Sequence, residues 1–108
     1  MTHFPDASTF KEHEIGTNIK IRVVAGEKIM FSFLEFQPGG EIAAHSHPHE
    51  QMGTVLEGEF ELTIGEETRI VRAGDTYIIP GSVPHSGRST GHRAVTLDVF
   101  SPPREDYL

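Results

Sequence analysis

Apolar and polar side chains alternate along most of the chain with a period of two. This pattern is typical of half-buried β-strands, because successive side chains of a strand point to opposite faces of a sheet. Glycine and proline separate the runs, and no window has the periodicity of a helix of useful length. The predicted strands are residues 18–24, 28–37, 53–56, 59–64, 68–72, 76–79 and 92–100. Many short strands of this kind predict an all-β sandwich or barrel.

The first sixteen residues depart from this pattern. Residues 1–16 are polar and lack periodicity, so we expect an N-terminal arm in which Asp6 or Ser8 caps at most one helical turn. The remaining residues, 17–108, have the length of a single domain with one hydrophobic core. Within this domain, the Pro-Gly-Gly sequence at residues 38–40 predicts a turn.

One predicted strand, residues 28–37, is apolar on both faces. One face carries Ile29, Phe31 and Phe33, and the other carries Met30, Leu34 and Phe36. A strand of this kind is covered twice, by the core on one side and by a second element on the other. We expect the second cover to be another copy of the chain in a homodimer. The alternative is a central strand lying under a loop.

The last predicted strand, residues 92–100, places polar and apolar side chains on one face. Asp98 and Phe100 are two residues apart and therefore point the same way. Polar residues on the inward face of a small barrel line a cavity, and we expect these two side chains to do so. The alternative is that Asp98 faces solvent beside an exposed Phe100.

Two prolines end this strand and stiffen the approach to Arg104. An arginine near a cavity can hold a carboxylate or a phosphate through its planar fork of N–H donors. Alternatively, Arg104 lies on the surface and pairs with Glu105 or Asp106. Both interpretations are compatible with the sequence.

Histidines are concentrated in residues 45–51, which read HSHPHEQ. His45 and His47 are two residues apart, so on an extended strand they project to one side and can reach one metal ion. Gln51 supplies a third donor, although Glu50 competes for this place because a carboxylate is the stronger ligand. Two imidazoles and an oxygen donor suit one divalent ion of zinc, iron, nickel or manganese better than calcium or magnesium.

His85 is the candidate for a fourth ligand, since it follows its own strand and turn signals about forty residues further on. His49 follows Pro48, which breaks the strand, so we interpret His49 as a surface histidine or as one that supports the ligands from outside. The alternative for the whole segment is a solvated turn whose histidines bind nothing.

Composition narrows the class of protein further. The formal charge of −7 argues against a nucleic-acid partner, which would need a face rich in Lys and Arg. The chain has no cysteine, which rules out disulfides, thiolate nucleophiles and cysteine-ligated zinc. No apolar run reaches the length of a membrane span or of the core of a signal peptide. We therefore expect a cytoplasmic protein without a membrane partner.

The ligand segment resembles the first motif of the cupin family. Gly39 is followed after five residues by His45-Ser46-His47, after three more by Gln51, and after six more by Gly58. Most cupins carry Glu where this chain has Gln51. If a metal is held by three neutral imidazoles and a neutral amide, it keeps its full double positive charge. Such a site favours an anionic ligand.

A second stretch resembles the other cupin motif, with Gly74, five residues, Pro80 and then His85. It departs from the usual pattern in having Gly81 directly after the proline and Ser89 where Asn is common. The resemblance implies a double-stranded β-helix, the cupin jelly-roll barrel, and adds to the expectation of a dimer.

The tail, LDVFSPPREDYL, is similar to that of the small single-domain cupins of pectin and alginate breakdown, which linearise unsaturated uronic acids. In that group the HSHPHEQ segment and a terminal D-x-F-S-P-x-R-E-D run occur together. The resemblance implies that the metal ligands are His45, His47, Gln51 and His85. It also implies that Asp98 acts as acid or base, that Arg104 holds the carboxylate of a small sugar acid, and that Phe100 packs on its ring.

Two other kinds of function are compatible with the same residues. One is an iron-dependent dioxygenase or a polyketide-type cyclase, because this ligand set leaves open positions on the metal for oxygen or a planar substrate. The other is a non-enzymatic module that binds a small acid or sugar.

Overall fold

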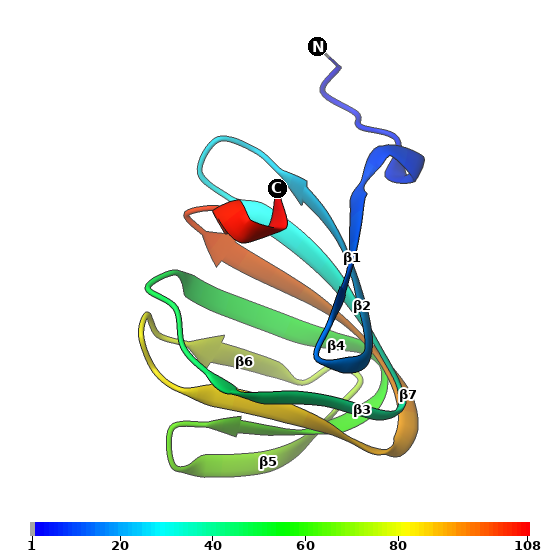
Figure 1. The fold of residues 1–108 in the computed structure, drawn as a ribbon, viewed down its shortest axis with the longest axis vertical. Coiled ribbons are helices and arrows are strands. Elements are labelled where there is room, and N and C mark those ends of the chain that lie inside the picture. Colours follow the sequence, from blue (N-terminus) through cyan, green and yellow to red (C-terminus); the bar gives the residue numbers. More distant parts are fainter. Residues whose placement is uncertain (1) are drawn as a thin grey trace.

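Residues 2–108, described by a computed structural model, form an all-β barrel of seven strands with two short 3-10 turns (Figure 1). Neighbouring strands pair antiparallel in the order β1-β2-β3-β7-β4-β5, and β6 pairs with β4. The elements are η1 Ala7–Thr9, β1 Lys11–Ile15, β2 Thr17–Ala25, β3 Met30–His45, β4 Glu50–Ile64, β5 Glu67–Arg72, β6 Thr76–Ile79, β7 His85–Ser101 and η2 Glu105–Tyr107. None of the described helical turns is long and apolar enough to cross a membrane. The predicted all-β class is confirmed.

The three longest strands, β3, β4 and β7, are longer than the sequence predicted. Each contains a glycine with a positive φ: Gly39 at 84°, Gly58 at 72° and Gly91 at 98°. The pairing of β3 with β7 shifts register between Phe36 and Glu41, the interval that contains Gly39, which is the mark of a β-bulge. The turn predicted at residues 38–40 is therefore wrong, because β3 continues through it as a bulged strand.

Gly58 has the same effect in β4. The sequence predicted two strands on either side of this glycine, whereas the structure has one strand that changes register there. A Cβ at Gly58 would collide with the main-chain oxygen of Arg93 on β7, and its φ of 72° is unfavourable for other residues. A glycine at this point lets one long strand contribute to both halves of the barrel.

The strand β1 lies in the segment predicted to be an arm. It pairs with β2 along its whole length, from Lys11 opposite Val23 to Ile15 opposite Ile19. Most side chains of β1 are exposed, so backbone hydrogen bonds hold this edge strand and apolar periodicity did not reveal it. The predicted cap is present, since the Asp6 side chain accepts a hydrogen bond from the N–H of Ser8 in η1. Met1 lies outside the described residues, and the domain boundary at residue 17 stays a prediction.

The inward faces of β3 and β7 form much of the core, as their alternation predicted. On β3 the inward side chains are Met30, Ser32, Leu34 and Phe36, and on β7 they are Ala94, Thr96, Asp98 and Phe100. All eight are at most 7% exposed. The polar members of this set lie together in the middle of the two strands, where Ser32 is paired with Asp98. The core is therefore interrupted by a polar patch.

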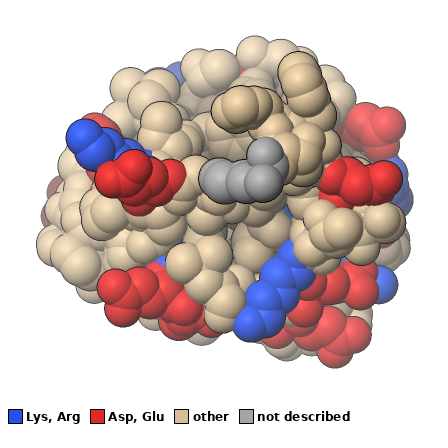
Figure 2. Space-filling view, turned by 90° about the horizontal axis from the view of Figure 1, so that it is seen from above, with Lys and Arg blue, Asp and Glu red and all other residues tan. Residues whose placement is uncertain are grey.

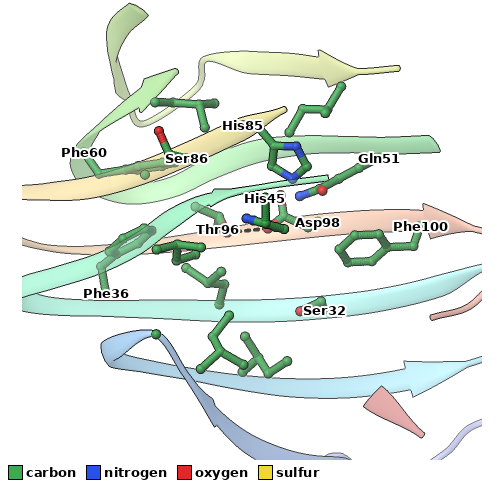
Figure 3. Close-up of a pocket in the computed structure, with 18 of the residues that line it drawn as sticks. Ser32, Phe36, His45, Gln51, Phe60, His85, Ser86, Thr96, Asp98 and Phe100 are labelled. Carbon is green, nitrogen blue, oxygen red and sulfur yellow. Dashed lines mark hydrogen bonds between the residues drawn. The ribbon is translucent and has the colours of Figure 1, made fainter. Parts of the chain in front are cut away.

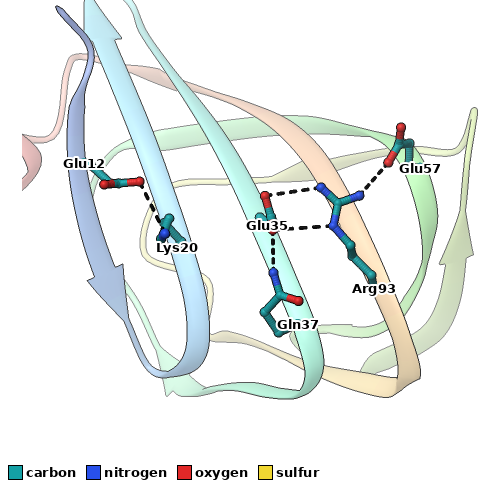
Figure 4. Close-up of polar contacts among 6 residues, drawn as sticks. All are labelled: Glu12, Lys20, Glu35, Gln37, Glu57 and Arg93. Carbon is teal, nitrogen blue, oxygen red and sulfur yellow. Dashed lines mark hydrogen bonds and ion pairs between the residues drawn. The ribbon is translucent and has the colours of Figure 1, made fainter. Parts of the chain in front are cut away.

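Ion pairs cross the outer surface of the barrel (Figure 4). Arg93 on β7 lies 3.3 Å from Glu35 on β3 and 2.7 Å from Glu57 on β4, and Lys20 pairs with Glu12 at 3.6 Å. Exposed pairs of this kind contribute roughly 0–1 kcal/mol each, so strand register depends mainly on the buried face.

Acidic side chains lie around the rim of the barrel end that carries the two termini, while the middle of this end is mainly uncharged (Figure 2).

Candidate metal centre

Three histidines from separate parts of the fold converge on one point. His45 is the last residue of β3, His85 is the first residue of β7, and the two are paired in register. His47 lies in the loop beyond the end of β3, so the prediction that it shares a strand with His45 is wrong. The loop nevertheless brings its ring to the other two, and ligand nitrogens of all three lie within 4.8 Å of one another.

All three imidazoles are oriented by the backbone. The Nδ1 atoms of these rings lie at hydrogen-bonding distance from carbonyl oxygens: His45 to Ala43 at 2.9 Å, His47 to His49 at 3.1 Å, and His85 to Val83 at 2.9 Å. A carbonyl can only accept, so Nδ1 must carry the proton and donate it. In a neutral ring this leaves the lone pair on Nε2, which is the atom available to a metal.

The remaining nitrogens fit a divalent metal ion. The buried Nε2 of His85 has no hydrogen-bond partner among residues 2–108. The Nε2 of His47 lies 3.2 Å from Oε1 of Gln51, so two lone pairs face each other. This contact is repulsive by itself, but ligands bound at roughly 2.0–2.2 Å to one ion lie about this far apart. The donor set therefore fits a metal bound to three imidazoles and an amide oxygen.

The position of the third predicted ligand favours Gln51 over Glu50. Gln51 is 8% exposed and lines the cavity, whereas Glu50 is exposed and points to the other face of β4. A hydrogen bond from the Gln51 side chain also lowers the pKa of Asp98. Since a carboxylate accepts, the amide N–H₂ of Gln51 points to Asp98 and its oxygen points to His47.

Burial keeps the histidines in the form that binds metal. Burial, together with the positive charges of Arg104 and His85, lowers the pKa of His47 to about 4. Burial also lowers the pKa of His85, with a smaller contribution from His45. Both rings are therefore neutral near pH 7, and a neutral imidazole is the state that coordinates a metal.

Asp98 is the buried carboxyl group of the site. It is 3% exposed and accepts hydrogen bonds from the Tyr77 hydroxyl at 2.5 Å and from Oγ1 of Thr96 at 3.2 Å. Burial raises the pKa of Asp98 to about 6, although the hydrogen bonds from Tyr77, Thr96 and Gln51 act in the opposite direction. A carboxyl group with this pKa can both give and take a proton near neutral pH.

Arg104 lies at the edge of the same cavity. Its guanidinium carbon is 4.2 Å from the ring centroid of Tyr107 and 5.4 Å from that of Phe100. Its Nε and Nη2 atoms also donate to the carboxylate of Asp106 at 3.3 and 2.9 Å, so the surface pairing foreseen as an alternative is present. The side chain is only 13% exposed and lines the cavity, so Arg104 combines both predicted positions.

These residues share one cavity of about 320 Å³ (Figure 3). The volume lies at the lower end of the range for small-molecule sites, roughly 300–1,000 Å³, and suits one small ligand rather than a polymer. The predicted residues that line it are His45, Gln51, His85, Asp98, Phe100 and Arg104. Most of the other lining side chains are apolar.

Comparison with known proteins places the chain in a family. Residues 32–100 match the family model described as the cupin domain. The chain belongs to the cupin family. The pectin degradation protein KdgF of Dickeya dadantii is 33% identical to this cupin over 97 residues, which cover 88% of each chain.

Solved structures confirm the predicted double-stranded β-helix of this cupin. An RmlC-like cupin from Shewanella frigidimarina superposes with a TM-score of 0.89 at 28% identity, covering 100% of this chain and 97% of that one. KdgF from Halomonas sp. superposes with a TM-score of 0.87 at 26% identity over the full length of both chains. The resemblance predicted from the tail is thus supported by both sequence and fold.

Sequence reasoning missed Tyr77, although it placed the strand that carries it. Tyr77 on β6 and Asp98 on β7 are both paired with Gly53 on the intervening strand β4. A Cβ at Gly53 would collide with the Asp98 carboxylate and the Tyr77 ring. The hydrogen bond between Tyr77 and Asp98 therefore depends on having glycine at this position of β4. The available signal was a glycine inside a strand, which often marks a close approach.

Proposed function

We propose that this cupin is a metal-dependent enzyme that converts 4,5-unsaturated uronic acid monosaccharides from pectin or alginate into linear keto sugar acids. The observation that carries the proposal is the presence of a proton-exchanging carboxyl, Asp98, in one small cavity with Arg104 and two histidines of the cluster, His45 and His85. Similarity to the KdgF proteins of Dickeya and Halomonas supports it.

The reaction is an isomerisation that consumes no oxidant or water. The hemiacetal hydroxyl loses its proton, the bond between C1 and the ring oxygen breaks, and that oxygen takes the electron pair and gains a proton to give an enol at C5. The enol then loses its O–H proton while C4 gains one, which leaves an aldehyde and a ketone. Asp98 is the group that moves these protons, because its pKa of about 6 permits both directions.

The other residues hold the substrate. The Arg104 guanidinium binds the carboxylate, and the Phe100 ring, 3% exposed, packs against the sugar ring. His45, His47, Gln51 and His85 would hold one nickel, iron, zinc or manganese ion. When bound, such an ion supplies Lewis-acid stabilisation of a substrate oxygen.

The direct test is to incubate protein of known metal content with a 4,5-unsaturated uronate and follow the ultraviolet band of the enol ether. We expect the band to disappear faster than in buffer containing the same metal ion without protein. Equal rates in the two samples would contradict the proposed reaction.

The apolar lining favours a second candidate, an iron-dependent dioxygenase or a cyclase that acts on a less polar acid. Ile21, Leu34 and Phe60 are among the side chains that line the cavity. Oxygen consumption would identify a dioxygenase.

Tight binding of an acid without turnover would instead identify a binding module.

Arg104→Lys is expected to raise KM for the uronate more than it lowers kcat. Lysine keeps the positive charge but loses the planar fork that binds a carboxylate through two N–H groups. Steady-state kinetics measure the two effects, and Arg88→Lys serves as a control because Arg88 is exposed and pairs with Glu61 away from the substrate. A lower kcat at unchanged KM would contradict the role of Arg104 as a clamp.

We further propose that the outer face of the sheet pairs with a second copy of the chain. An outward row of apolar side chains crosses β3, β7, β4 and β6 through the pairs Phe31–Val99, Val99–Met52 and Met52–Ile78. Three members of this row are 42–58% exposed. Burial of such a surface against its own copy would complete the cover predicted for residues 28–37.

Light scattering at micromolar concentration is expected to give twice the mass of one chain. Phe31→Glu should yield the monomer, because it places a charge within the apolar row. Ile70→Glu is the matched control, since Ile70 on β5 has the same 42% exposure as Phe31 but lies outside the row. A monomeric wild-type protein would contradict the proposed dimer.

A further inference from the structure

Ser32 interrupts an otherwise apolar series on the inward face of β3. Met30 and Leu34, the next inward side chains on either side, are 0% and 7% exposed, and Ser32 is 2% exposed. The side chain lines the cavity. Packing alone would be satisfied by an apolar side chain of similar size, so the hydroxyl group requires another explanation.

The strand register places Ser32 beside Asp98. The two residues are direct partners in the pairing of β3 with β7, and both face inward. Side chains paired in this way have Cβ atoms roughly 4.5–5.5 Å apart. In the view of Figure 3, Ser32 and His85 lie on opposite sides of Asp98. A ligand that reaches from the histidines past Asp98 would therefore meet Ser32.

The Ser32 hydroxyl does not hydrogen-bond Asp98, unlike the other polar groups around this carboxylate. Thr96 and Tyr77 both donate their hydroxyl hydrogens to Asp98. The hydrogen bonds that lower the pKa of Asp98 come from Tyr77, Thr96 and Gln51, and none comes from Ser32. Because Ser32 lines the cavity and its hydroxyl is not used to hold Asp98, the hydroxyl is available to hydrogen-bond a ligand there.

We propose that Ser32 is a specificity-determining residue that hydrogen-bonds a hydroxyl group of the substrate. This inference rests on the proposed function and deepens it. Arg104 holds the carboxylate at one position, the histidine cluster lies at another, and Ser32 recognises a ring hydroxyl beside Asp98. The site then selects a polyhydroxylated acid over an acid of the same size that lacks this hydroxyl, because without it the Ser32 hydroxyl is left unpaired in the complex.

The test compares binding of a saturated uronate, D-galacturonate, with binding of its 2-deoxy and 3-deoxy analogues by calorimetry, using metal-loaded wild type and Ser32→Ala. D-Galacturonate lacks the 4,5 double bond, so binding is measured without turnover. We expect Ser32→Ala to weaken D-galacturonate binding by roughly three- to tenfold, the usual effect of one neutral hydrogen bond. One deoxy analogue should bind to both proteins equally well, which identifies the recognised hydroxyl.

Thermal unfolding of the two ligand-free proteins provides the control for structure, and we expect equal Tm values. A lower Tm together with an equal loss of affinity for all three ligands would make Ser32 a structural residue and overturn the proposal. Equal binding of D-galacturonate by wild type and Ser32→Ala would overturn it while leaving the proposed function intact. If wild type does not bind D-galacturonate but still depletes the enol-ether band of the unsaturated uronate, the hydroxyl recognition is overturned and the proposed function stands. Absence of both binding and turnover would contradict the proposed function.

Discussion

Asp98→Asn is expected to reduce turnover of a 4,5-unsaturated uronate by ~10²–10⁴-fold, the usual contribution of a positioned acid or base. The substitution preserves the shape of the side chain and an oxygen that can accept from Tyr77 at the position of the present 2.5 Å hydrogen bond. It removes only the group that exchanges protons. Metal content should stay the same, because the donor set consists of three histidines and Gln51.

The matched control for this experiment is Asp6→Asn. Asp6 is exposed, caps the turn η1 and does not line the cavity. Asparagine is an equally good cap. Its turnover should equal that of the wild type. Full activity of Asp98→Asn would assign Asp98 a structural role and reduce the proposal to a metal-binding cupin with another substrate.

The same variant also tests how Asp98 makes the stability of the fold depend on pH. Burial raises the pKa of Asp98 from 3.8 to about 6, so the folded chain binds this proton more tightly than the unfolded chain does. This proton therefore contributes to the free energy of unfolding. The contribution, about 3 kcal/mol, is fully present below about pH 3.8 and is lost as the pH rises through about 6. Asp98→Asn has no such titration. Urea unfolding of the metal-free proteins should therefore show that the free energy of unfolding of the variant increases relative to that of the wild type between about pH 4 and pH 7.

His45→Ala is expected to lose most of the bound metal. The substitution removes one of three imidazoles whose nitrogens meet within 4.8 Å, and the two remaining rings and Gln51 cannot complete the shell. Elemental analysis after dialysis measures the effect as ions per chain. Turnover of the uronate should fall in parallel, because the Lewis acid is lost with the ion.

His49→Ala is the control for the metal measurement. His49 belongs to the same segment, and its carbonyl oxygen accepts from Nδ1 of His47 while its ring packs edge-on against the His47 ring at 5.4 Å. Its ring is not one of the three whose nitrogens converge. Alanine keeps that carbonyl, so metal content should be unchanged. If His45→Ala retained as much metal as His49→Ala, the assignment of the ligands would be wrong.

Short-range patterns in the sequence predicted much of the candidate site. The spacing within HSHPHEQ, together with His85, indicated a single donor set, and the structure brings the three histidines together. The alternation around Asp98 and Phe100 predicted that both side chains face inward, and both are 3% exposed. These features could be predicted because the period of a strand determines the face to which each side chain points.

Other features depend on contacts between strands that are distant in the sequence. Tyr77 reaches Asp98 only because β4 places Gly53 between them, and Ser32 lies beside Asp98 only because β3 pairs with β7 in one particular register. The strand β1 is held by backbone pairing with β2, which leaves no apolar pattern to detect. Periodicity specifies the faces of a strand but not its neighbours. The sequence by itself therefore determined the ligand types and the inward faces, whereas the tertiary pairing decided which groups surround Asp98.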